Sequence, residues 1–325
     1  MKYRRAGASG LLLPELSLGL WQNFGDAADD RETKKIVTTA FDNGITYIDL
    51  ANNYGPPPGS AERRFGRILK EELAAYRDEL IIATKAGYDM WQGPYGNWGS
   101  KKYLIASLDQ SLRRMGLDYV DIFYHHRPDP QTPMEETAEA LYQAVRSGKA
   151  LYAAVSNYPL KDAMRMNELL EGYGIHPIVN QVRYNIYDRE IEKDNRLLGM
   201  ENIGMGAVIF SPLHQGLLTD KYLEGKVPSD SRAVSSERLQ GILKNEPELL
   251  EKLGTLNSLA RSRGQTLSEL ALTWLLAKGN VTTVLAGART LGQLEGNLKA
   301  LSGPRTFTQE ELQVIEGTFP SVFTR

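Results

Sequence analysis

Residues 80–85 read Leu80-Ile81-Ile82-Ala83-Thr84-Lys85, a short apolar run that ends in a charged side chain. Two further runs, at residues 46–49 and 119–126, end in the same way at Asp49 and His126. Apolar runs of this length are typical of buried β-strands, and a helical pattern follows each one. If the strands are parallel neighbours, their ionisable last residues and the nearby Tyr54 converge at one end of a sheet.

Apolar runs alternate with helical patterns along the chain, and most spacings between successive strand ends are 27 to 41 residues. Each spacing fits one strand plus one helix, and eight such units close naturally into a barrel. The alternative is a doubly wound open sheet, which binds dinucleotides through a G-x-G-x-x-G turn that residues 18–25 lack. We therefore predict an α/β fold, a single-domain (β/α)8 TIM barrel over residues 1–325. Its strands should end near Gly19, Asp49, Lys85, His126, Ser156, Arg183, Ser211 and Gly287.

The remaining segments predict what surrounds the strands. Residues 2–14 read as an N-terminal β-hairpin that plugs the bottom of the barrel. Residues 87–101 predict a substrate loop over the open face, residues 225–236 a mobile lid, and residues 307–325 an extra C-terminal helix that packs over the rim. Helices are expected at residues 31–43, 61–75, 101–115, 134–147, 160–173 and 191–202, with a longer helical region at 243–278.

The composition excludes several classes of function. Hydrophobic residues make up 42% of the chain, charged residues 24%, and the net charge is −2, so we expect neither nucleic acid nor membrane as a partner. The absence of cysteine excludes thiolate catalysis and cysteine-bound metals. A zinc site on histidine is not expected either, because no H-x-H or H-E-x-x-H pattern occurs. The first residues lack the apolar core of a secretion signal, so cytoplasmic residence is the expectation.

The four convergent side chains suit proton transfer to a carbonyl oxygen. Tyr54 is the candidate acid, and an adjacent Lys85 ammonium should favour its phenolate and so lower its pKa. Asp49 would hold Lys85, while His126 would hydrogen-bond the substrate oxygen. None of the four is a strong nucleophile, which points to hydride transfer from a nicotinamide. His125 faces the other side of its strand, and His126 is preferred because it precedes Arg127-Pro128.

These residues and their flanks resemble the aldo-keto reductase superfamily over nearly the whole chain. The family's tetrad matches Asp49-Leu50-Ala51-Asn52-Asn53-Tyr54, Ala83-Thr84-Lys85 and Phe123-Tyr124-His125-His126-Arg127-Pro128. Residues 53–55, 93–100 and 127–137 are similar to the potassium-channel β-subunit branch, and within it to the bacterial L-glyceraldehyde 3-phosphate and methylglyoxal reductases. The resemblance implies a TIM barrel and NADPH-dependent reduction of small aldehydes or α-oxoaldehydes. It also makes a homo-oligomer, a tetramer or larger, plausible.

Cofactor contacts follow from the same resemblance. Arg289 also precedes a predicted helix, whose start favours an anion such as the 2′-phosphate, and this supports NADPH over NADH. In place of the glutamate that the family often has before the asparagine, this chain has Gly296, which puts an adenine contact in doubt. The expected contacts are Gly19, Trp21, Asp49, Ser156, Asn157, Gln181, Phe210, Ser211, Pro212, Leu213, Gln215, Gly216, Lys221, Arg232, Gly287, Arg289, Gln293 and Asn297.

The predicted substrate pocket surrounds the tetrad, and Arg127 or Lys101 would suit an anionic substrate. A different function is also open: the channel β-subunits imply a nucleotide-sensing regulatory subunit with little turnover. Those subunits carry asparagine where this chain has His126, and the full tetrad favours turnover. A metal-dependent barrel hydrolase is the third alternative. The pocket residues expected are Trp21, Tyr54, Trp91, Trp98, His126 and Arg127.

Overall fold

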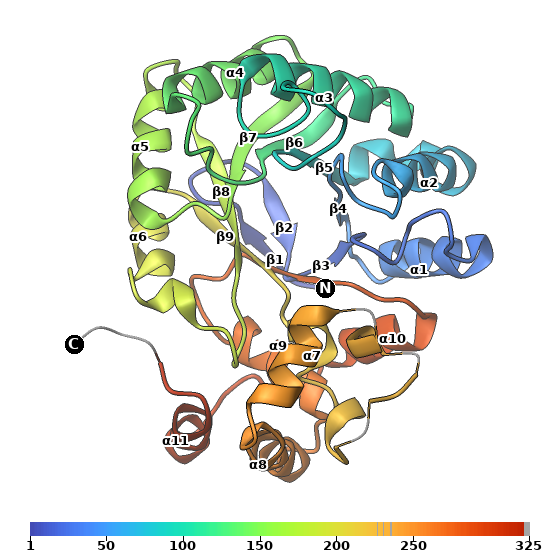
Figure 1. Ribbon diagram of the computed structural model, residues 1–325, viewed down its shortest axis with the longest axis vertical. Helices are drawn as coiled ribbons and strands as arrows, with labels where there is room; N and C mark the ends of the chain where they lie inside the picture. The colour runs from blue at the N-terminus through green and yellow to red at the C-terminus, as the bar shows by residue number, and fades with distance from the viewer. Residues whose placement is uncertain (226, 230, 235, 322–325) are drawn as a thin grey trace.

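A computed structural model describes residues 1–225, 227–229, 231–234 and 236–321 and contains a closed barrel of eight parallel strands (Figure 1). The predicted (β/α)8 barrel is therefore confirmed. The strands are short, mainly apolar runs because both faces of a parallel barrel are buried, and every residue of β5 is buried. Around the barrel the order is β3 (Leu16–Gly19), β4 (Tyr47–Asp49), β5 (Ile81–Ala86), β6 (Val120–His125), β7 (Ala150–Ser156), β8 (Pro177–Arg183), β9 (Gly206–Phe210) and β10 (Thr283–Ala286), which closes on β3.

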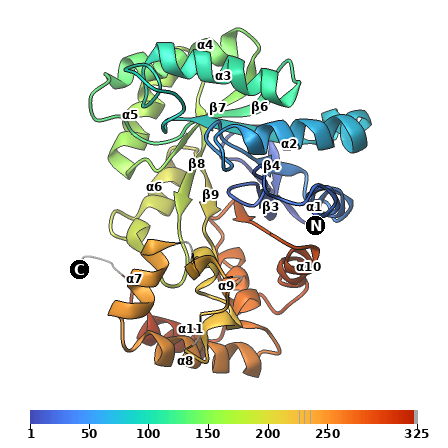
Figure 2. The ribbon, with the colours of Figure 1, turned by 45° about the vertical axis from the view of Figure 1, so that its right-hand side comes forward.

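Helices pack around the strands, and their ends follow local capping chemistry (Figures 1 and 2). The side chain of Ser100 accepts a hydrogen bond from the backbone of Tyr103 and starts α3, which ends at Gly116 in a left-handed conformation. The predicted bounds of this helix are correct to the residue. The first five helices are α1 (Asp30–Asp42), α2 (Ser60–Ile68), α3 (Lys101–Met115), α4 (Met134–Arg146) and α5 (Leu160–Glu171).

Three helix predictions are wrong in extent. After α2 the chain forms a π turn at Leu69–Leu73 and a 3-10 turn at Ala74–Glu79 instead of continuing to residue 75 as one helix. The helix expected at 191–202 is shortened to α6 (Arg196–Asn202), because Asn195 takes a left-handed φ of 50° in front of it.

The helical region expected at 243–278 begins earlier, at Glu237, and consists of three helices: α7 (Glu237–Asn245), α8 (Leu249–Ser262) and α9 (Leu267–Leu276). Pro247 ends the first, since it has no N–H and pushes Glu246 out of the helical region. Gly264, with a φ of 67°, ends the second, and a capping box on Thr266 and Glu269 starts the third.

The N-terminal hairpin closes the bottom of the barrel as predicted. It consists of β1 (Tyr3–Arg5) and β2 (Leu12–Pro14), and its Ala6 and Leu13 pack in one buried cluster with the side chains of the barrel interior. Gly7 has a φ of 56°, and a Cβ there would lie 2.1 Å from the carbonyl oxygen of Gly204. Only glycine fits this close approach, which seats the hairpin on the barrel floor.

The C-terminal part contributes α10 (Leu291–Lys299) and α11 (Gln309–Thr318), which confirms the extra helices. The predicted capping box of α11 is present on Thr308 and Glu311, and α11 packs against α8 instead of over the rim; these two helices and α7 lie together at the lower end of both views (Figures 1 and 2). The predicted lid includes residues 226, 230 and 235, and the predicted C-terminal segment includes residues 322–325, all of which lie outside the described residues. None of the described helices has the length and hydropathy needed to cross a membrane.

The contact between α2 and α3 provides a test of the packing. A Cβ on Gly66 would lie 2.7 Å from the carbonyl oxygen and 2.8 Å from the Cα of Met115, so Gly66→Ala must push the two backbones apart. We expect the free energy of unfolding to fall by about 1–3 kcal/mol in guanidinium denaturation. The matched control is Gly254→Ala within α8, where nothing lies within 4 Å of the new methyl group. It should raise stability by about 0.5–1 kcal/mol, and equal effects of the two variants would contradict the packing argument.

Candidate active site

Four ionisable side chains meet at the carboxyl ends of three neighbouring strands. Asp49 is the last residue of β4, Lys85 lies near the end of β5, and His126 follows β6 directly. Tyr54 comes from the connection between β4 and α2. All four are buried, with exposures from 0% for Lys85 to 8% for Tyr54. Because the strands are parallel and adjacent, residues far apart in the chain are brought to one face of the barrel.

Lys85 is hydrogen-bonded to two of the other three side chains, Asp49 and Tyr54. Its Nζ donates to Asp49 Oδ2 at 2.6 Å, to the carbonyl oxygen of Leu50 at 2.6 Å and to Tyr54 Oη at 3.3 Å. These bonds use all three protons of the ammonium group. Lys85 is therefore held rigidly in a position where a positive charge lies next to the phenol oxygen.

Asp49 is fixed by residues on other strands. Its Oδ1 accepts hydrogen bonds from Gln181 Nε2 at 2.8 Å and from Tyr47 Oη at 3.2 Å, and Tyr47 Oη lies 2.7 Å from Tyr124 Oη. Gln181 is an expected contact of the nicotinamide, and in the structure its side-chain amide donates a hydrogen bond to Asp49. The sequence analysis missed Tyr47 and Tyr124. Strand periodicity was the available signal, since each lies two residues before a site residue and so faces the same side.

His126 lies beside Tyr54 and beside a residue that sequence reasoning missed. Its ring centroid is 5.9 Å from that of Tyr54 and 4.7 Å from that of Tyr88, both in edge-to-face geometry. The Nδ1 atom of His126 is buried and has no hydrogen-bond partner among the described residues. A proton there would be left unpaired, which favours the neutral tautomer with the proton on Nε2. His125 points to the other side of β6, where its Nδ1 lies 2.7 Å from Tyr158 Oη.

Burial sets the protonation states of the site. Burial, followed by the negative charge of Asp49, raises the pKa of Tyr54 well above its ordinary value. The expected net lowering of this pKa is therefore not found, because burial disfavours a phenolate that water does not solvate. Burial also lowers the pKa of Lys85, against the opposing effect of Asp49. The pKa of His126 falls well below 6.5 because of burial and then the charge of Lys85.

The expected nicotinamide contacts lie at the next strand ends. Asn157, just after β7, has a φ of 61° and donates through Nδ2 to the carbonyl oxygen of His126 at 3.0 Å. Ser156 donates to the carbonyl oxygen of Gln181 at 2.9 Å. Phe210, half-buried, ends β9. The structure thus places Asn157 and Gln181 next to the tetrad, Ser156 beside both of them, and Phe210 at the end of the next strand.

The loop after β9 has an unusual backbone. Ser211, His214 and Gln215 have φ values of 54°, 43° and 58°, and Gly216 has a φ of 96°. Left-handed conformations at residues other than glycine are strained and are concentrated at binding and catalytic sites. Pro212 and Leu213 lie inside this loop, and Lys221 is exposed in the 3-10 turn Asp220–Tyr222 that follows.

Two arginines from distant segments, Arg232 and Arg289, influence each other electrostatically. Burial, followed by the positive charge of Arg289, lowers the pKa of Arg232. Arg232 Nη2 lies 3.4 Å from Asn23 Oδ1, its Nη1 donates to Gln22 Oε1, and its guanidinium carbon is 5.7 Å from the ring centroid of Trp21. Arg232 and Arg289 thus contribute two positive charges to the same region of the protein.

The start of α10 completes this region. The backbone N–H of Arg289 donates to Gln293 Oε1 at 2.8 Å, and Asn297 Nδ2 lies 3.5 Å from the carbonyl oxygen of Gly287. Gly19 and Gly287 end adjacent strands, and a Cβ on Gly287 would lie 3.6 Å from the carbonyl oxygen of Gly19. Many of the residues that the resemblance implies for the cofactor therefore lie at or just after the carboxyl ends of β3, β4, β7, β8, β9 and β10.

The expected substrate residues divide into two groups. Trp98 and Arg127 lie on the side of His126, with the guanidinium carbon 3.7 Å from the Trp98 ring centroid. Trp91 is half-buried against Tyr103, at 5.2 Å between ring centroids. Trp21, 41% exposed, lies instead beside Arg232.

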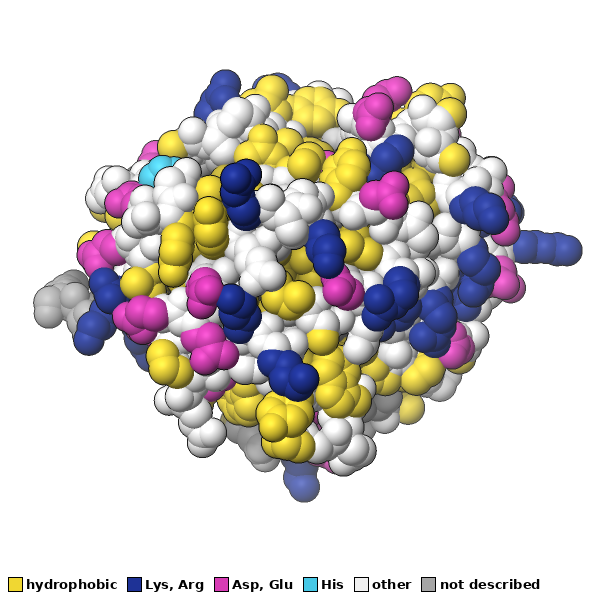
Figure 3. Space-filling model, turned by 90° about the horizontal axis from the view of Figure 1, so that it is seen from above, with side chains coloured by type: hydrophobic (Ala, Val, Ile, Leu, Met, Phe, Trp, Pro, Cys, Tyr) yellow, Lys and Arg dark blue, Asp and Glu magenta, His cyan; other side chains and the backbone are white. Residues whose placement is uncertain are grey.

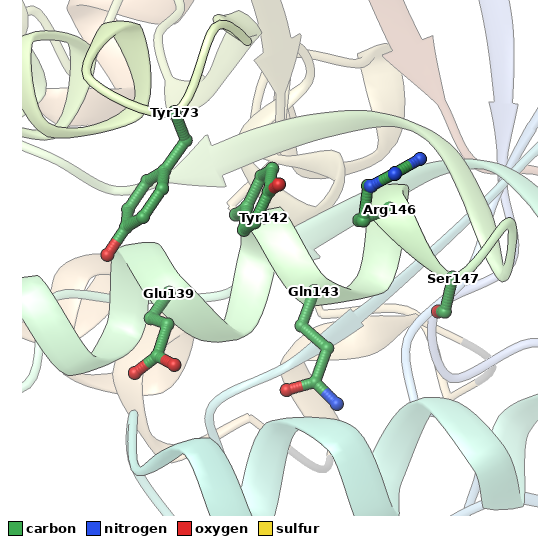
Figure 4. Close-up of a pocket in the computed structure, with 6 residues that line it drawn as sticks. All are labelled: Glu139, Tyr142, Gln143, Arg146, Ser147 and Tyr173. Atoms are coloured by element: carbon green, nitrogen blue, oxygen red, sulfur yellow. The ribbon is translucent and has the colours of Figure 1, made fainter.

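A separate groove occurs on the outer surface, over α4. It is lined from α4 and from Tyr173, just after α5, and the rings of Tyr142 and Tyr173 are stacked with centroids 4.7 Å apart (Figure 4). Figure 3, which looks onto the α3 and α4 side of the molecule, shows hydrophobic, basic and acidic side chains interspersed. The groove contains none of the residues at the barrel mouth, so it takes no part in the site described above.

Comparisons with known proteins agree with this arrangement. The model of the Aldo/keto reductase family matches residues 15–318. L-glyceraldehyde 3-phosphate reductase of Escherichia coli, in strains O157:H7 and K12, is 53% identical over 322 residues, which cover 97% of this chain and 92% of that protein. A probable voltage-gated potassium channel subunit beta of Arabidopsis thaliana is 33% identical over 332 residues, covering 99% of this chain and 97% of that protein. The resemblances to the aldo-keto reductases, to the L-glyceraldehyde 3-phosphate reductases and to the potassium-channel β-subunits are therefore confirmed.

Proposed function

The chain belongs to the aldo/keto reductase family and is an oxidoreductase, and we propose that it reduces small aldehydes and α-oxoaldehydes to alcohols with NADPH. One observation carries this proposal: Lys85 Nζ lies 2.6 Å from Asp49 and 3.3 Å from Tyr54, with His126 beside the phenol ring. The name of the Escherichia coli relative supports L-glyceraldehyde 3-phosphate as a substrate, and the α-oxoaldehydes are proposed from the sequence resemblance alone.

In the proposed mechanism Tyr54 is the proton donor. Its raised pKa keeps the phenol protonated, so the proton is available at neutral pH. As that proton moves to the carbonyl oxygen, negative charge develops on Tyr54 Oη, and the Lys85 ammonium is positioned to stabilise it. His126, neutral with its proton on Nε2, would donate to the same carbonyl oxygen and orient it.

A nicotinamide cofactor, when bound, supplies the hydride that adds to the carbonyl carbon, so that one hydride and the Tyr54 proton convert the carbonyl into an alcohol. The residues that would hold it are the expected cofactor contacts, from Asn157 and Gln181 to Arg289. The fit rests on two features: the left-handed loop Ser211 to Gly216, whose backbone lies at the mouth, and the positive charges of Arg232 and Arg289, which influence each other electrostatically. Two basic side chains support a cofactor with an additional phosphate group, NADPH rather than NADH.

A variant of Arg289 tests the cofactor proposal. We expect Arg289→Gln to raise KM for NADPH by about 10- to 100-fold, because a charge-assisted hydrogen bond to a phosphate contributes roughly 1.5–3 kcal/mol. KM for NADH should change by less than about threefold, since that cofactor lacks the phosphate. The control is Arg146→Gln on the outer face of α4, which should leave both values unchanged. A parallel rise for NADPH and NADH would show that Arg289 does not read the 2′-phosphate.

The reaction itself is tested by a panel of aldehydes with each cofactor. Glyceraldehyde 3-phosphate, glyceraldehyde and methylglyoxal should be reduced with NADPH at steady state, with a lower kcat/KM when NADH replaces it. Oxidation of NADPH should match alcohol formation one to one. Absence of turnover with every aldehyde and both cofactors would overturn the proposed function.

The pH dependence follows from the three pKa directions. His126 has a lowered pKa and stays neutral, Tyr54 has a raised pKa and stays protonated, and Lys85 has a lowered pKa and loses its charge on the alkaline side. We expect kcat/KM to stay level around neutral pH and to fall on the alkaline side, below the ordinary titration range of lysine, as Lys85 loses its proton. In Lys85→Arg, whose guanidinium does not titrate, the alkaline fall should be absent whatever the rate. An acid limb that disappears in His126→Gln would show instead that His126 titrates.

A second function has a specific observation in its favour, the 33% identity to a protein named as a potassium channel subunit. In that case the chain would sense nucleotide redox state with little turnover. Stopped-flow kinetics separates the two: oxidation of one NADPH per chain followed by a negligible steady-state rate would favour the sensor. The proposed reductase continues to turn over at the single-turnover rate or at the rate of product release.

A further inference from the structure

The residue after His126 is a cation in an uncommon setting. The guanidinium carbon of Arg127 lies 3.7 Å from the ring centroid of Trp98 and 4.1 Å from that of Tyr88, so aromatic rings contact it from two residues of the loop 87–100. Its Nε donates to the carbonyl oxygen of Gly87 at 2.9 Å, and its Nη2 donates to Asn97 Oδ1 at 2.9 Å. These contacts fix the direction of the guanidinium group before any substrate binds.

None of these partners neutralises the charge. Within the described residues no carboxylate lies within ion-pair distance of Arg127, and its Nη1 makes no hydrogen bond. Asp129, two residues further on, is occupied by the backbone N–H groups of Gly99, Gln131 and Thr132. The half-buried guanidinium of Arg127 thus contacts only aromatic rings and uncharged oxygen atoms. An anion that accepts two hydrogen bonds from it would stabilise its charge more than these contacts do.

The position of Arg127 relates it to the reacting group. Arg127 and His126 contact the same Tyr88 ring, at 4.1 Å and 4.7 Å respectively. The first residue of the loop 87–100 also lies next to the tetrad, because a Cβ on Gly87 would lie 2.8 Å from His126 Cβ. A small molecule with its carbonyl oxygen at Tyr54 and His126 would therefore place a group a few bonds away next to Arg127.

The other basic residue considered from the sequence has a different environment. Lys101 starts α3, and its Nζ lies 2.6 Å from Glu139 Oε1 on α4. Its charge is paired on the outer surface, about one-third exposed, and it is not part of the Tyr88 contact. The structure therefore separates two candidates that the sequence left equivalent.

We propose that Arg127 is a specificity-determining residue that binds the phosphate of a short phosphorylated aldehyde while Tyr54 and His126 hold its carbonyl. This inference rests on the proposed function and specifies its substrate class. The competing role is structural: Arg127 would only fasten the loop 87–100 over His126, through Trp98, Tyr88 and Asn97. The two roles differ in whether the phosphate matters.

Kinetics with matched substrates tests the proposal. Glyceraldehyde 3-phosphate and glyceraldehyde share a carbon skeleton and differ in the phosphate. In Arg127→Gln, kcat/KM for the phosphorylated aldehyde should fall by about 30- to 100-fold, mainly through KM, while glyceraldehyde changes by less than about threefold. Arg127→Lys should recover part of the loss, since it keeps the charge without the planar fork. Lys101→Gln is the control, and it should leave both aldehydes unaffected.

The contrary outcomes are specific. Equal losses for both aldehydes in Arg127→Gln would assign Arg127 to loop fastening alone, and no loss for either would remove it from the site; both results overturn the proposal. Titration calorimetry with inorganic phosphate on NADP+-saturated protein gives a readout independent of turnover: wild type should bind phosphate, and Arg127→Gln should bind it at least tenfold more weakly, about the effect of one charge-assisted bond. If wild type reduces no aldehyde, the proposed function fails, and the phosphate titration still decides the role of Arg127.

Discussion

Tyr54→Phe is expected to lower kcat for aldehyde reduction by about 10³-fold while leaving NADPH affinity within about twofold. The change removes the single oxygen atom that lies 3.3 Å from Lys85 Nζ, and nothing else in the described site can deliver a proton there. His126 is neutral, and a neutral imidazole does not give up its proton readily. Burial lowers the pKa of Lys85, but its ammonium group is held in an ion pair with Asp49. Steady-state and single-turnover oxidation of NADPH measure the rate, and quenching of protein fluorescence measures cofactor binding.

Tyr95→Phe is the matched control for this variant. Tyr95 lies in the next strand-to-helix connection, after β5, and is 54% exposed, so loss of its hydroxyl should leave kcat unchanged. Retention of more than about a tenth of the wild-type kcat in Tyr54→Phe would exclude Tyr54 as the principal proton donor, because general acids contribute about 10²- to 10⁴-fold.

Lys85→Met is expected to affect both catalysis and stability. The variant leaves the Asp49 carboxylate buried, at 2% exposure, with hydrogen bonds from Gln181 and Tyr47 but without a counter-charge. Removal of one partner of a buried ion pair typically costs about 3–5 kcal/mol, so guanidinium denaturation should show a loss of that order. Turnover should fall by at least about 10³-fold, because the charge that stabilises the Tyr54 phenolate is lost together with the position of the phenol.

A double variant separates the two effects. In Lys85→Met with Asp49→Asn, no unpaired charge remains, and the asparagine oxygen can still accept from Gln181 and Tyr47. We expect most of the free energy of unfolding to return while the rate stays at the level of Lys85→Met. A single Lys85→Met variant that loses less than about 1 kcal/mol would contradict the ion pair as the main interaction of Asp49.

The fold followed closely from the periodicity of the chain. The expected strand ends at Gly19, Asp49 and Ser156 are those of the structure, because strands buried on both faces give short apolar runs bounded by polar residues. Boundaries within the 243–278 region were not recognised. Helical periodicity continues across a break, and the local residues that cause the breaks, Pro247 and Gly264, have strong effects only in the context of what the helices pack against.

Sequence alone was sufficient to nominate Asp49, Tyr54, Lys85 and His126, since strand ends in a parallel barrel meet at one face whatever the details of packing. Alternation along the strand showed that only one of His125 and His126 can enter the site, and the flanking Arg127-Pro128 indicated His126. Only the tertiary structure decided how these side chains are held and charged. The bonds of Asp49 to Gln181 and Tyr47, the ring of Tyr88 against His126 and the pairing of Lys101 with Glu139 join residues that are remote in the chain.

The raised pKa of Tyr54 shows most clearly what depends on the tertiary structure and not on the sequence alone. The sequence places an ammonium beside the phenol and so suggests a lowered value, whereas burial in the folded barrel removes the water that would solvate a phenolate and raises it. Desolvation depends on every atom packed around the group, and these atoms come from β4, β5, β6 and β8 together. The order of residues thus determined which side chains reach the mouth of the barrel, and the packing around them decided their charges and their partners.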